Sequence, residues 1–431
     1  MSKIDLLEND PAVGTDVSTK SVSETHSRPR LPYVGTVFEG LLFFLPLLLA
    51  IELLLSVNHI GEQEYLKIDP NLGFTHLENK LVTDRTEAFA INHINSRGLI
   101  DSEHEFAKAA DTTRVAVLGD SIVEAIQVPI QLRFTTLLEH QLEARYKRKF
   151  EVMNFGTGGF STGQEYLQFV QSVRAYKPDV VLLVLHQGDE EENGPAGSKW
   201  SLRPTFSLNP DGSTAVRWLE FDTWRHSRSA DPLSFFDWGR RHSHIWQALL
   251  QVYDSVKNDS LFKRIYNSLA SANDRVLVLT QSLSPERRQK LIEHKLQDLS
   301  VLDGERLSLC REGFLTEDKG LAPSSYDKMQ QWKLELRLLE LFNEKCFSDH
   351  CKFVVAPFYA AEQPKASQDI FAQHLLTVKA QARQSGFQVV DLTPSIENAP
   401  DQKTRPIFLL AHLSPRGHEI VSKALSDSIK W

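Results

Sequence analysis

The sequence is poor in cysteine and has no excess of positive charge. Three Cys among 431 residues cannot form a disulfide scaffold, and no Cys or His spacing matches a zinc site. The net charge of −8 gives no reason to expect a nucleic-acid partner. Cys346 and Cys351 are close enough to pair in an oxidising compartment, leaving Cys310 alone, but three free thiols fit equally well. We expect neither a metal nor a cofactor.

Long hydrophobic runs are also scarce, and the composition is ordinary. Hydrophobic residues at 41% and charged residues at 24% are typical of globular proteins. These values exclude a collagen-like fibre, a mostly disordered chain and a polytopic membrane protein. At about 150 residues per domain, 431 residues leave room for about three domains or segments.

One apolar run stands out, at residues 33–57, after a polar segment at 1–32 that we expect to be a disordered tail. At about 1.5 Å per residue, the run can cross a hydrocarbon core about 30 Å thick. Its uncharged centre, residues 40–51, is short enough to be a signal-peptide core, and a buried helix is a third reading. No small-x-small cleavage site follows. We therefore predict an uncleaved single transmembrane anchor.

The charged residues on either side of this run predict its orientation. Lys20, Arg28 and Arg30 precede it, whereas Lys67 alone follows it closely. Positive residues favour the cytoplasmic side of a membrane. The tail is therefore predicted to be cytoplasmic, and residues 58–431 to be extracytoplasmic.

Apolar, β-branched runs alternate with helix-like segments in the rest of the chain. The predicted strands cover residues 115–118, 151–155, 180–185, 275–279, 352–356 and 387–392. The predicted helices cover residues 135–146, 164–176, 242–269, 333–343, 371–385 and 415–430. This alternation is typical of an α/β fold with a parallel sheet covered on both faces.

The alternation of strands and helices starts near residue 112. We therefore divide the part after the apolar run into a lead-in at residues 58–111 and a main domain at 112–431. A large insertion at about 194–345 interrupts the main domain and holds most of the tryptophans. Its aromatic rings could stack on sugars or pack inside an inserted lid. The Glu190-Glu191-Glu192 run fits the end of a solvated loop better than a metal site, because bound cations need further oxygen ligands.

Candidate chemistry follows the strands, since ligands in open α/β sheets bind beyond the carboxyl ends of the strands. Gly119-Asp120-Ser121 follows the first main-domain strand, where Ser121 is either a nucleophile or an ordinary helix cap. Residues 154–160 follow the second strand and are rich in glycine, which suits an oxyanion-binding turn or a simple tight turn. His412 precedes the last helix and is either a base for Ser121 or a solvated loop residue.

Taken in order, these blocks resemble the SGNH/GDSL hydrolase family. The similar segments are residues 114–121 (nucleophile block), 154–162 (glycine block), 177–181 (approach to the third block) and 412–418 (histidine block). Residues 91–99 and the Glu-Leu-Leu-Leu run at 52–55 also resemble the lead-in and span of membrane-anchored bacterial members. The resemblance implies a flavodoxin-like three-layer domain held at a bacterial inner membrane.

The resemblance also implies site residues. Ser121 would be the nucleophile and His412 its base, since a hydroxyl attacks well only when a positioned base takes its proton. The backbone N–H groups of Ser121 and Gly159 would form the oxyanion hole. Gly188 stands where the family has an oxyanion-hole Asn, so Gln187 or His186 would have to donate instead.

A second departure concerns the histidine. Leu409 and Leu410 stand where the family has an Asp, so a backbone carbonyl or a distant carboxylate such as Asp189 would have to support His412. A Ser-His dyad can work, although loss of the Asp from an intact triad lowers the rate about 10⁴-fold.

Two functions follow from these observations. The first is a membrane-anchored serine esterase or O-acyltransferase acting through acyl-Ser121 on ester groups, such as O-acetyl groups of an envelope or exported polysaccharide. The second is a catalytically impaired protein of the same fold that binds glycans or assists assembly. The missing Asn and Asp favour the second, whereas Ser121, Gly159 and His412 favour the first.

Overall fold

The computed structural model of the 431-residue chain describes residues 34–58, 60, 65–69, 71–84, 87–194, 203–209, 211–218, 243–249, 293, 328–358, 365–400, 405–409 and 411–431. The chain divides into two compact units, residues 1–51 and 52–431. The predicted tail at 1–32, the predicted strand at 275–279 and most of the predicted helix at 242–269 lie outside the described residues.

Helix α1 (Val34–Val57) occupies the predicted transmembrane run. It continues through Pro46, and several of its large apolar side chains, such as Phe43 and Leu49, are exposed. Of the helices in the described ranges, however, none combines the length and the apolar character needed to cross a membrane. The anchor stays a prediction.

The core of the second unit is a five-stranded parallel sheet. Its strands are β5 (Thr112–Leu118), β6 (Lys149–Asn154), β7 (Val180–His186), β10 (Lys352–Phe358) and β11 (Gln388–Val389). They lie in the order β11-β10-β7-β5-β6, which is the flavodoxin-like order. The strands are buried on both faces, as expected for a parallel sheet between two helical layers. The predicted parallel-sheet α/β fold is confirmed.

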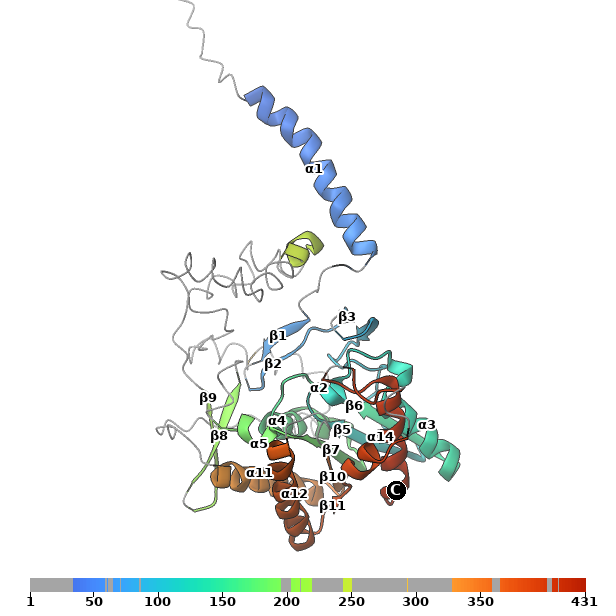
Figure 1. The fold of residues 1–431 in the computed structure, drawn as a ribbon, viewed down its shortest axis with the longest axis vertical. Helices are drawn as coiled ribbons and strands as arrows, with labels where there is room; N and C mark the ends of the chain where they lie inside the picture. The colour runs from blue at the N-terminus through green and yellow to red at the C-terminus, as the bar shows by residue number, and fades with distance from the viewer. Residues whose placement is uncertain are drawn as a thin grey trace, which may run out of the picture. The chain divides into compact units, whose positions relative to one another are not determined.

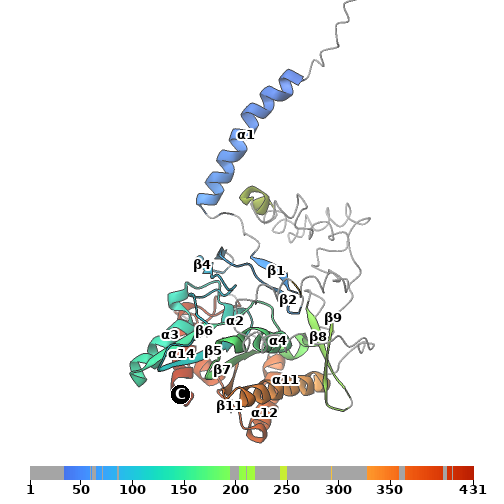
Figure 2. The same ribbon diagram turned by 180° about the vertical axis from the view of Figure 1, so that it is seen from behind.

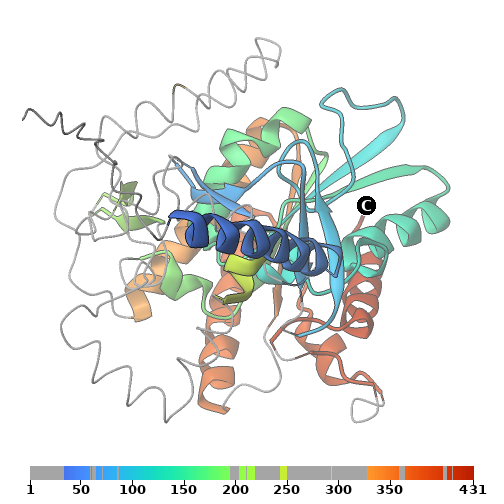
Figure 3. The ribbon, with the colours of Figure 1, turned by 90° about the horizontal axis from the view of Figure 1, so that it is seen from above.

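Helices cover both faces of this sheet. One layer consists of α3 (Phe134–Tyr146), α13 (Thr393–Glu397) and α14 (Pro415–Ser428). The other consists of α4 (Thr162–Gln171), the 3₁₀ turn η2 (Val173–Tyr176), α11 (Lys328–Ser348) and α12 (Lys365–Ser385). Alternate residues of β5 pack into opposite layers, Val115 and Val117 on one side and Ala116 and Leu118 on the other. Figures 1 and 3 show α3 beside α14, away from α11 and α12.

The lead-in forms two antiparallel hairpins. β1 (Leu66–Asp69) pairs with β2 (Gly73–His76), and β3 (Lys80–Asp84) pairs with β4 (Ala90–Ile94). They lie near the short helix α2 (Ser121–Glu124) that follows β5, as Figure 2 shows. Two buried contacts join them to this region: His76 Nε2 to Glu124 Oε1 (2.7 Å) and Asn92 Nδ2 to Ile126 O (2.8 Å).

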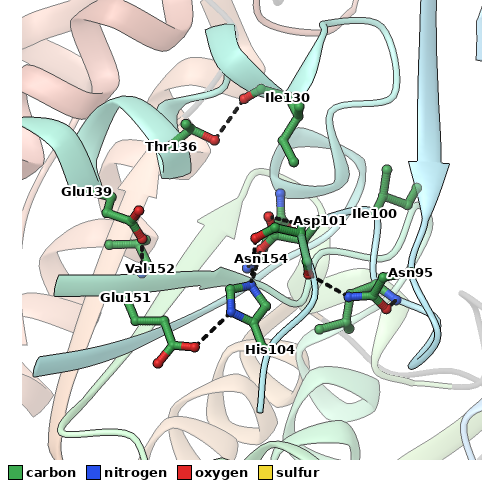
Figure 4. Close-up of polar contacts among 12 residues, drawn as sticks. Asn95, Ile100, Asp101, His104, Ile130, Thr136, Glu139, Glu151, Val152 and Asn154 are labelled. Atoms are coloured by element: carbon green, nitrogen blue, oxygen red, sulfur yellow. Dashed lines mark hydrogen bonds and ion pairs between the residues drawn. The ribbon is translucent and has the colours of Figure 1, made fainter. Parts of the chain in front are cut away.

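A polar junction joins the lead-in to β6 (Figure 4). Asp101 Oδ2 accepts from the backbone N–H of Asn154 (2.7 Å) and contacts His104 Nε2 (3.1 Å), while His104 Nδ1 contacts Glu151 Oε1 (2.9 Å). Burial alone would lower the pKa of His104, but its hydrogen bonds to the two carboxylates raise that pKa to about 9. The imidazolium and its partners therefore hold the lead-in against the sheet.

The insertion is only partly described. The short helix α5 (Asp189–Glu192) lies just before it, and the described part of the insertion includes the hairpin of β8 (Pro204–Leu208) and β9 (Thr214–Trp218), a helical stretch at residues 244–249 and the first part of α11. Phe206 packs so closely on Gly163 of α4 that a Cβ there would lie 2.2 Å from the ring. The predicted insertion boundary at residue 345 falls inside α11, whose Phe342 is fully buried in the core. Of the tryptophans in the predicted insertion, Trp218, Trp246 and Trp332 belong to the described residues, and the sugar-stacking face stays a prediction.

Two of the cysteines lie together at the end of α11. The backbone N–H of Cys351 donates to the carbonyl of Cys346 (2.8 Å), and both residues are free thiols. Burial and the neighbouring Cys351 raise the pKa of the Cys346 thiol well above its usual range. Cys310 lies outside the described residues.

Candidate active site

Ser121 lies at the carboxyl end of β5, on the first turn of α2. Asp120 caps this turn, because its Oδ1 accepts from the backbone N–H of Ile122 (2.9 Å). A Cβ on Gly119 would lie 2.3 Å from Val123 Cγ2, so only glycine permits this sharp turn without displacing Val123. The cap role that the sequence allowed for Ser121 therefore falls to Asp120. The Ser121 hydroxyl is left for another partner.

That partner is His412. Its Nε2 lies 2.9 Å from Ser121 Oγ. The loop that carries it is fixed on both sides: Leu409 N–H donates to the carbonyl of His412 (2.8 Å), and the Ser414 side chain caps α14 through Gly417 N–H (3.2 Å). The nucleophile and base expected from the sequence are thus within hydrogen-bonding distance.

The other ring nitrogen of His412 contacts a residue that sequence reasoning did not identify. His412 Nδ1 lies 2.8 Å from Glu87 Oε1, in the connection between β3 and β4. The backbone N–H groups of Ala411 (3.3 Å) and His412 (3.2 Å) also donate to this carboxylate. Glu87 is 325 residues away in sequence, and no spacing pattern links it to His412. The similarity of the adjoining residues 91–99 to a family lead-in was the one available signal.

Asp189 does not support His412, which corrects the sequence-based expectation. Its Oδ2 accepts from the backbone N–H of His186 (2.8 Å), and Asp189, the first residue of α5, is buried. Burial, with repulsion from Asp120 and Glu165, raises the pKa of Asp189 well above its usual range. Asp189 thus shapes the turn after β7 instead of orienting the histidine.

The glycine loop after β6 lies against the nucleophile turn. Thr157 N–H donates to the carbonyl of Gly119 (3.1 Å), and a Cβ on Gly156 would lie 2.2 Å from the backbone nitrogen of Glu124. Gly159 has φ +77°, a conformation that favours glycine. Within the described ranges, the N–H groups of Ser121 and Gly159 donate to no protein acceptor. Neither N–H is therefore already used by a described protein acceptor.

In the turn after β7, the N–H of Gly188 is already used within the turn. Gly188 N–H donates to Glu190 Oε2 (3.1 Å), and no described contact joins Gln187 or Gly188 to Ser121. Gln187 Oε1 is buried and has no partner within the described part of the chain. Gly188 has φ +108° and open space around the position of a Cβ.

One group of side chains near Ser121 has the spacing of a metal site. One ligand atom from each of Asp120, His186 and Asp189 lies within 4.8 Å of the others, and His186 Nδ1 is 3.6 Å from Asp120 Oδ2. Both carboxylates already accept backbone N–H groups, as described above. These bonds account for their positions without a cation.

A cavity of about 420 Å³ lies between the lead-in and the loop after α2. Its polar side chains bond to the surrounding backbone: Asn95 Nδ2 donates to Ser102 O (2.7 Å), and Asn92 Nδ2 donates to Ile126 O (2.8 Å). Arg133 likewise donates to Ile100 O (2.5 Å) and Val128 O (3.1 Å). Two of these contacts, from Asn92 to Ile126 and from Arg133 to Ile100, join the lead-in to the segment that follows α2.

No protein-family model and no curated protein matches this sequence. Solved structures that it resembles include LAE5, an α/β hydrolase enzyme from a metagenome of Lake Arreo, Spain (11% identity, TM-score 0.35, covering 76% of this chain and 99% of that one). Two catalytic mutants of Axe2, an acetylxylan esterase from Geobacillus stearothermophilus, have 12% and 13% identity and a TM-score of 0.34, over 74% of this chain and 95% of each of those.

A protein assigned to the G-D-S-L lipolytic family from Desulfitobacterium hafniense has 12% identity and a TM-score of 0.31, over 74% of this chain and 99% of that one. All of these TM-scores are below 0.5, so neither the fold nor the chemistry of this chain is inferred from the likenesses, and the chemistry rests on the contacts of Ser121.

Proposed function

We propose that this protein is a serine esterase or O-acyltransferase of the SGNH type. The observation that carries the proposal is the 2.9 Å contact between Ser121 Oγ and His412 Nε2. His412 takes the Ser121 proton as Oγ attacks the ester carbonyl, and it then protonates the leaving alkoxide. An acyl-Ser121 intermediate remains.

The developing oxyanion needs hydrogen-bond donors that are already in place. The N–H groups of Ser121 and Gly159 have no other acceptor in the described chain, which supports this role. Each such donor contributes roughly 2.7–4 kcal/mol to stabilisation of the transition state. Two backbone donors permit the reaction without the family's Asn.

The acyl group then passes to water or to a hydroxyl of a second substrate. Transfer to water makes an esterase, and transfer to a sugar makes an O-acyltransferase. We propose O-acetyl groups of an envelope or exported polysaccharide as the substrate, because the lead-in resembles that of membrane-anchored bacterial members. The same resemblance, with the apolar run at 33–57, supports a single-pass protein of the inner membrane whose catalytic unit is extracytoplasmic.

The test is hydrolysis of p-nitrophenyl acetate by the full chain in mild detergent. We expect Ser121→Ala and His412→Ala each to lower kcat by about 10⁴-fold or more. Ser428→Ala and His140→Ala, at exposed positions, are the matched controls and should keep full activity. An oligosaccharide acceptor in the same assay separates transfer from hydrolysis. Equal background rates in all five proteins, with and without the acceptor, would favour the glycan-binding alternative.

A further inference from the structure

Glu87 reaches the active site from the lead-in, outside the main domain predicted at 112–431. We propose that Glu87 is the positioning acid for His412, and that the lead-in is therefore an obligatory part of the active site. This inference rests on the proposed roles of Ser121 and His412. Glu87, from a remote segment, would thus replace the carboxylate that the resembled family has at the position of Leu409 or Leu410.

The contacts of the Glu87 carboxylate fix its orientation. Oε1 lies 2.8 Å from His412 Nδ1 and accepts from Ala411 N–H (3.3 Å), while Oε2 accepts from His412 N–H (3.2 Å). Its side chain is only 9% exposed. Three donors from one short loop leave the carboxylate little freedom to turn away.

This arrangement determines which nitrogen of His412 carries the proton. An ionised carboxylate can only accept hydrogen bonds, so the Nδ1 facing Glu87 must be the donor. Nε2 then holds a lone pair toward the hydroxyl of Ser121, as a general base requires. When Nε2 takes the Ser121 proton, the negative Glu87 stabilises the imidazolium and stays ionised itself.

The lead-in holds Glu87 from both directions. Asp84, the last residue of β3, accepts from the N–H groups of Glu87 (3.5 Å) and Ala88 (3.4 Å) and pairs with Ala90 at the start of β4. Farther back, His76 contacts Glu124 (2.7 Å), the last residue of the helix that begins at Ser121. One segment thus contacts both the nucleophile helix and the base, so its displacement would separate Glu87 from His412.

The kinetic test uses the full chain and the ester assay described above. We expect Glu87→Gln to lower kcat about 10⁴-fold with little change in KM, because an amide can favour the wrong tautomer. Glu87→Asp should retain more activity than Glu87→Gln. Added formate should restore part of the activity of Glu87→Ala and none of that of Ser121→Ala. Glu78→Gln, at a partly exposed ion pair with Lys67, is the matched control and should match the wild type.

A second readout does not depend on the choice of ester. In protein labelled with ¹⁵N-histidine, the Nδ1 proton of His412 should give a strongly downfield proton NMR signal. That signal should vanish in Glu87→Gln and His412→Ala but persist in Ser121→Ala. Absence of the signal from the wild type, or wild-type kcat in Glu87→Gln, would overturn the role of Glu87. A wild type no faster than Ser121→Ala would instead count against the proposed function.

Discussion

The two sides of Ser121 differ in how they compensate for a residue that is present in the SGNH/GDSL family, which the sequence resembles, but absent from this chain. On the histidine side, the usual Asp is absent, yet His412 Nδ1 still contacts a carboxylate, that of Glu87 (2.8 Å). On the side of the turn after β7, the usual Asn is absent, and no described contact puts Gln187 or Gly188 on Ser121. The absence of the Asp is thus offset by Glu87 from a remote segment. The absence of the Asn leaves only the backbone N–H groups as proposed donors to the oxyanion. The absence of one motif residue can therefore be offset by a distant part of the chain, while the absence of another is not.

The largest expected effect concerns how the lead-in is held. His76→Ala would leave Glu124 buried without its imidazole partner, since both side chains are 2–3% exposed. Leaving a buried hydrogen-bonding group without its partner costs about 1–3 kcal/mol of unfolding free energy, and more for a charged group. Urea denaturation measures this loss. Lys67→Ala, which removes a partly exposed pair, should cost less than about 1 kcal/mol, and equal losses would contradict a rigid junction.

The next effect tests the backbone donors. Gly159→Ala places a side chain at φ +77° and shifts the N–H assigned to the oxyanion. We expect kcat to fall about 10²–10³-fold, as for loss of one oxyanion donor. Gly212→Ala, at φ +83° in open space between β8 and β9, carries the same backbone strain and should leave kcat unchanged. If both variants behave alike, the N–H of Gly159 has no special role.

A pH-dependent effect of similar size concerns the junction in Figure 4. The pKa of His104 rises from 6.5 to about 9 on folding, so its stabilisation is complete below about pH 6.5 and is lost as the pH rises through 9. The loss amounts to about 3 kcal/mol. Denaturation midpoints between pH 6 and 10 would reveal it, and His104→Gln should flatten the curve. If the denaturation midpoint of His104→Gln changes with pH as steeply as that of the wild type, a group other than His104 causes the pH dependence.

The smallest effect would strengthen the weaker side of the site. Gly188→Asn returns the family's amide at a position with φ +108° and no neighbour within 4 Å of a Cβ. Because Asn tolerates positive φ better than most residues, we expect kcat to rise up to about tenfold. Gly188→Ala has the strain without the donor and should give no gain. A gain in both variants would point to the backbone instead of the amide.

Much of the sheet could be predicted from the sequence. Its central strands are buried on both faces, so each of them appears in the sequence as a continuous apolar run rich in β-branched residues. The run at 115–118 became the carboxyl end of β5 and the run at 180–185 became most of β7, whereas the roles of Ser121 and His412 came from the resemblance of their sequence blocks to a known family. The boundary of the insertion could not be read from the sequence, because α11 begins at Lys328, before residue 345, and already packs Phe342 into the core of the main domain.

The acid partner of His412 could not be predicted, for a physical reason. The contact between Glu87 and His412 exists only after the β3–β4 hairpin packs beside α2, and nothing local to either residue encodes it. Asp189 was a reasonable candidate by position, but its carboxylate is already used by the backbone N–H of His186 (2.8 Å). The carboxylate of Asp189 accepts a hydrogen bond from its own turn, whereas the carboxylate of Glu87 contacts His412.

The most direct test of the central claim is the rate at which a fluorophosphonate modifies the full chain, with the modified residue located by peptide mass spectrometry. Such a reagent reports an activated serine without any knowledge of the natural ester. We expect rapid, single modification at Ser121, and a rate lower by several orders of magnitude in His412→Ala. No modification of Ser121, or the same rate in the wild type and His412→Ala, would contradict a serine nucleophile activated by His412.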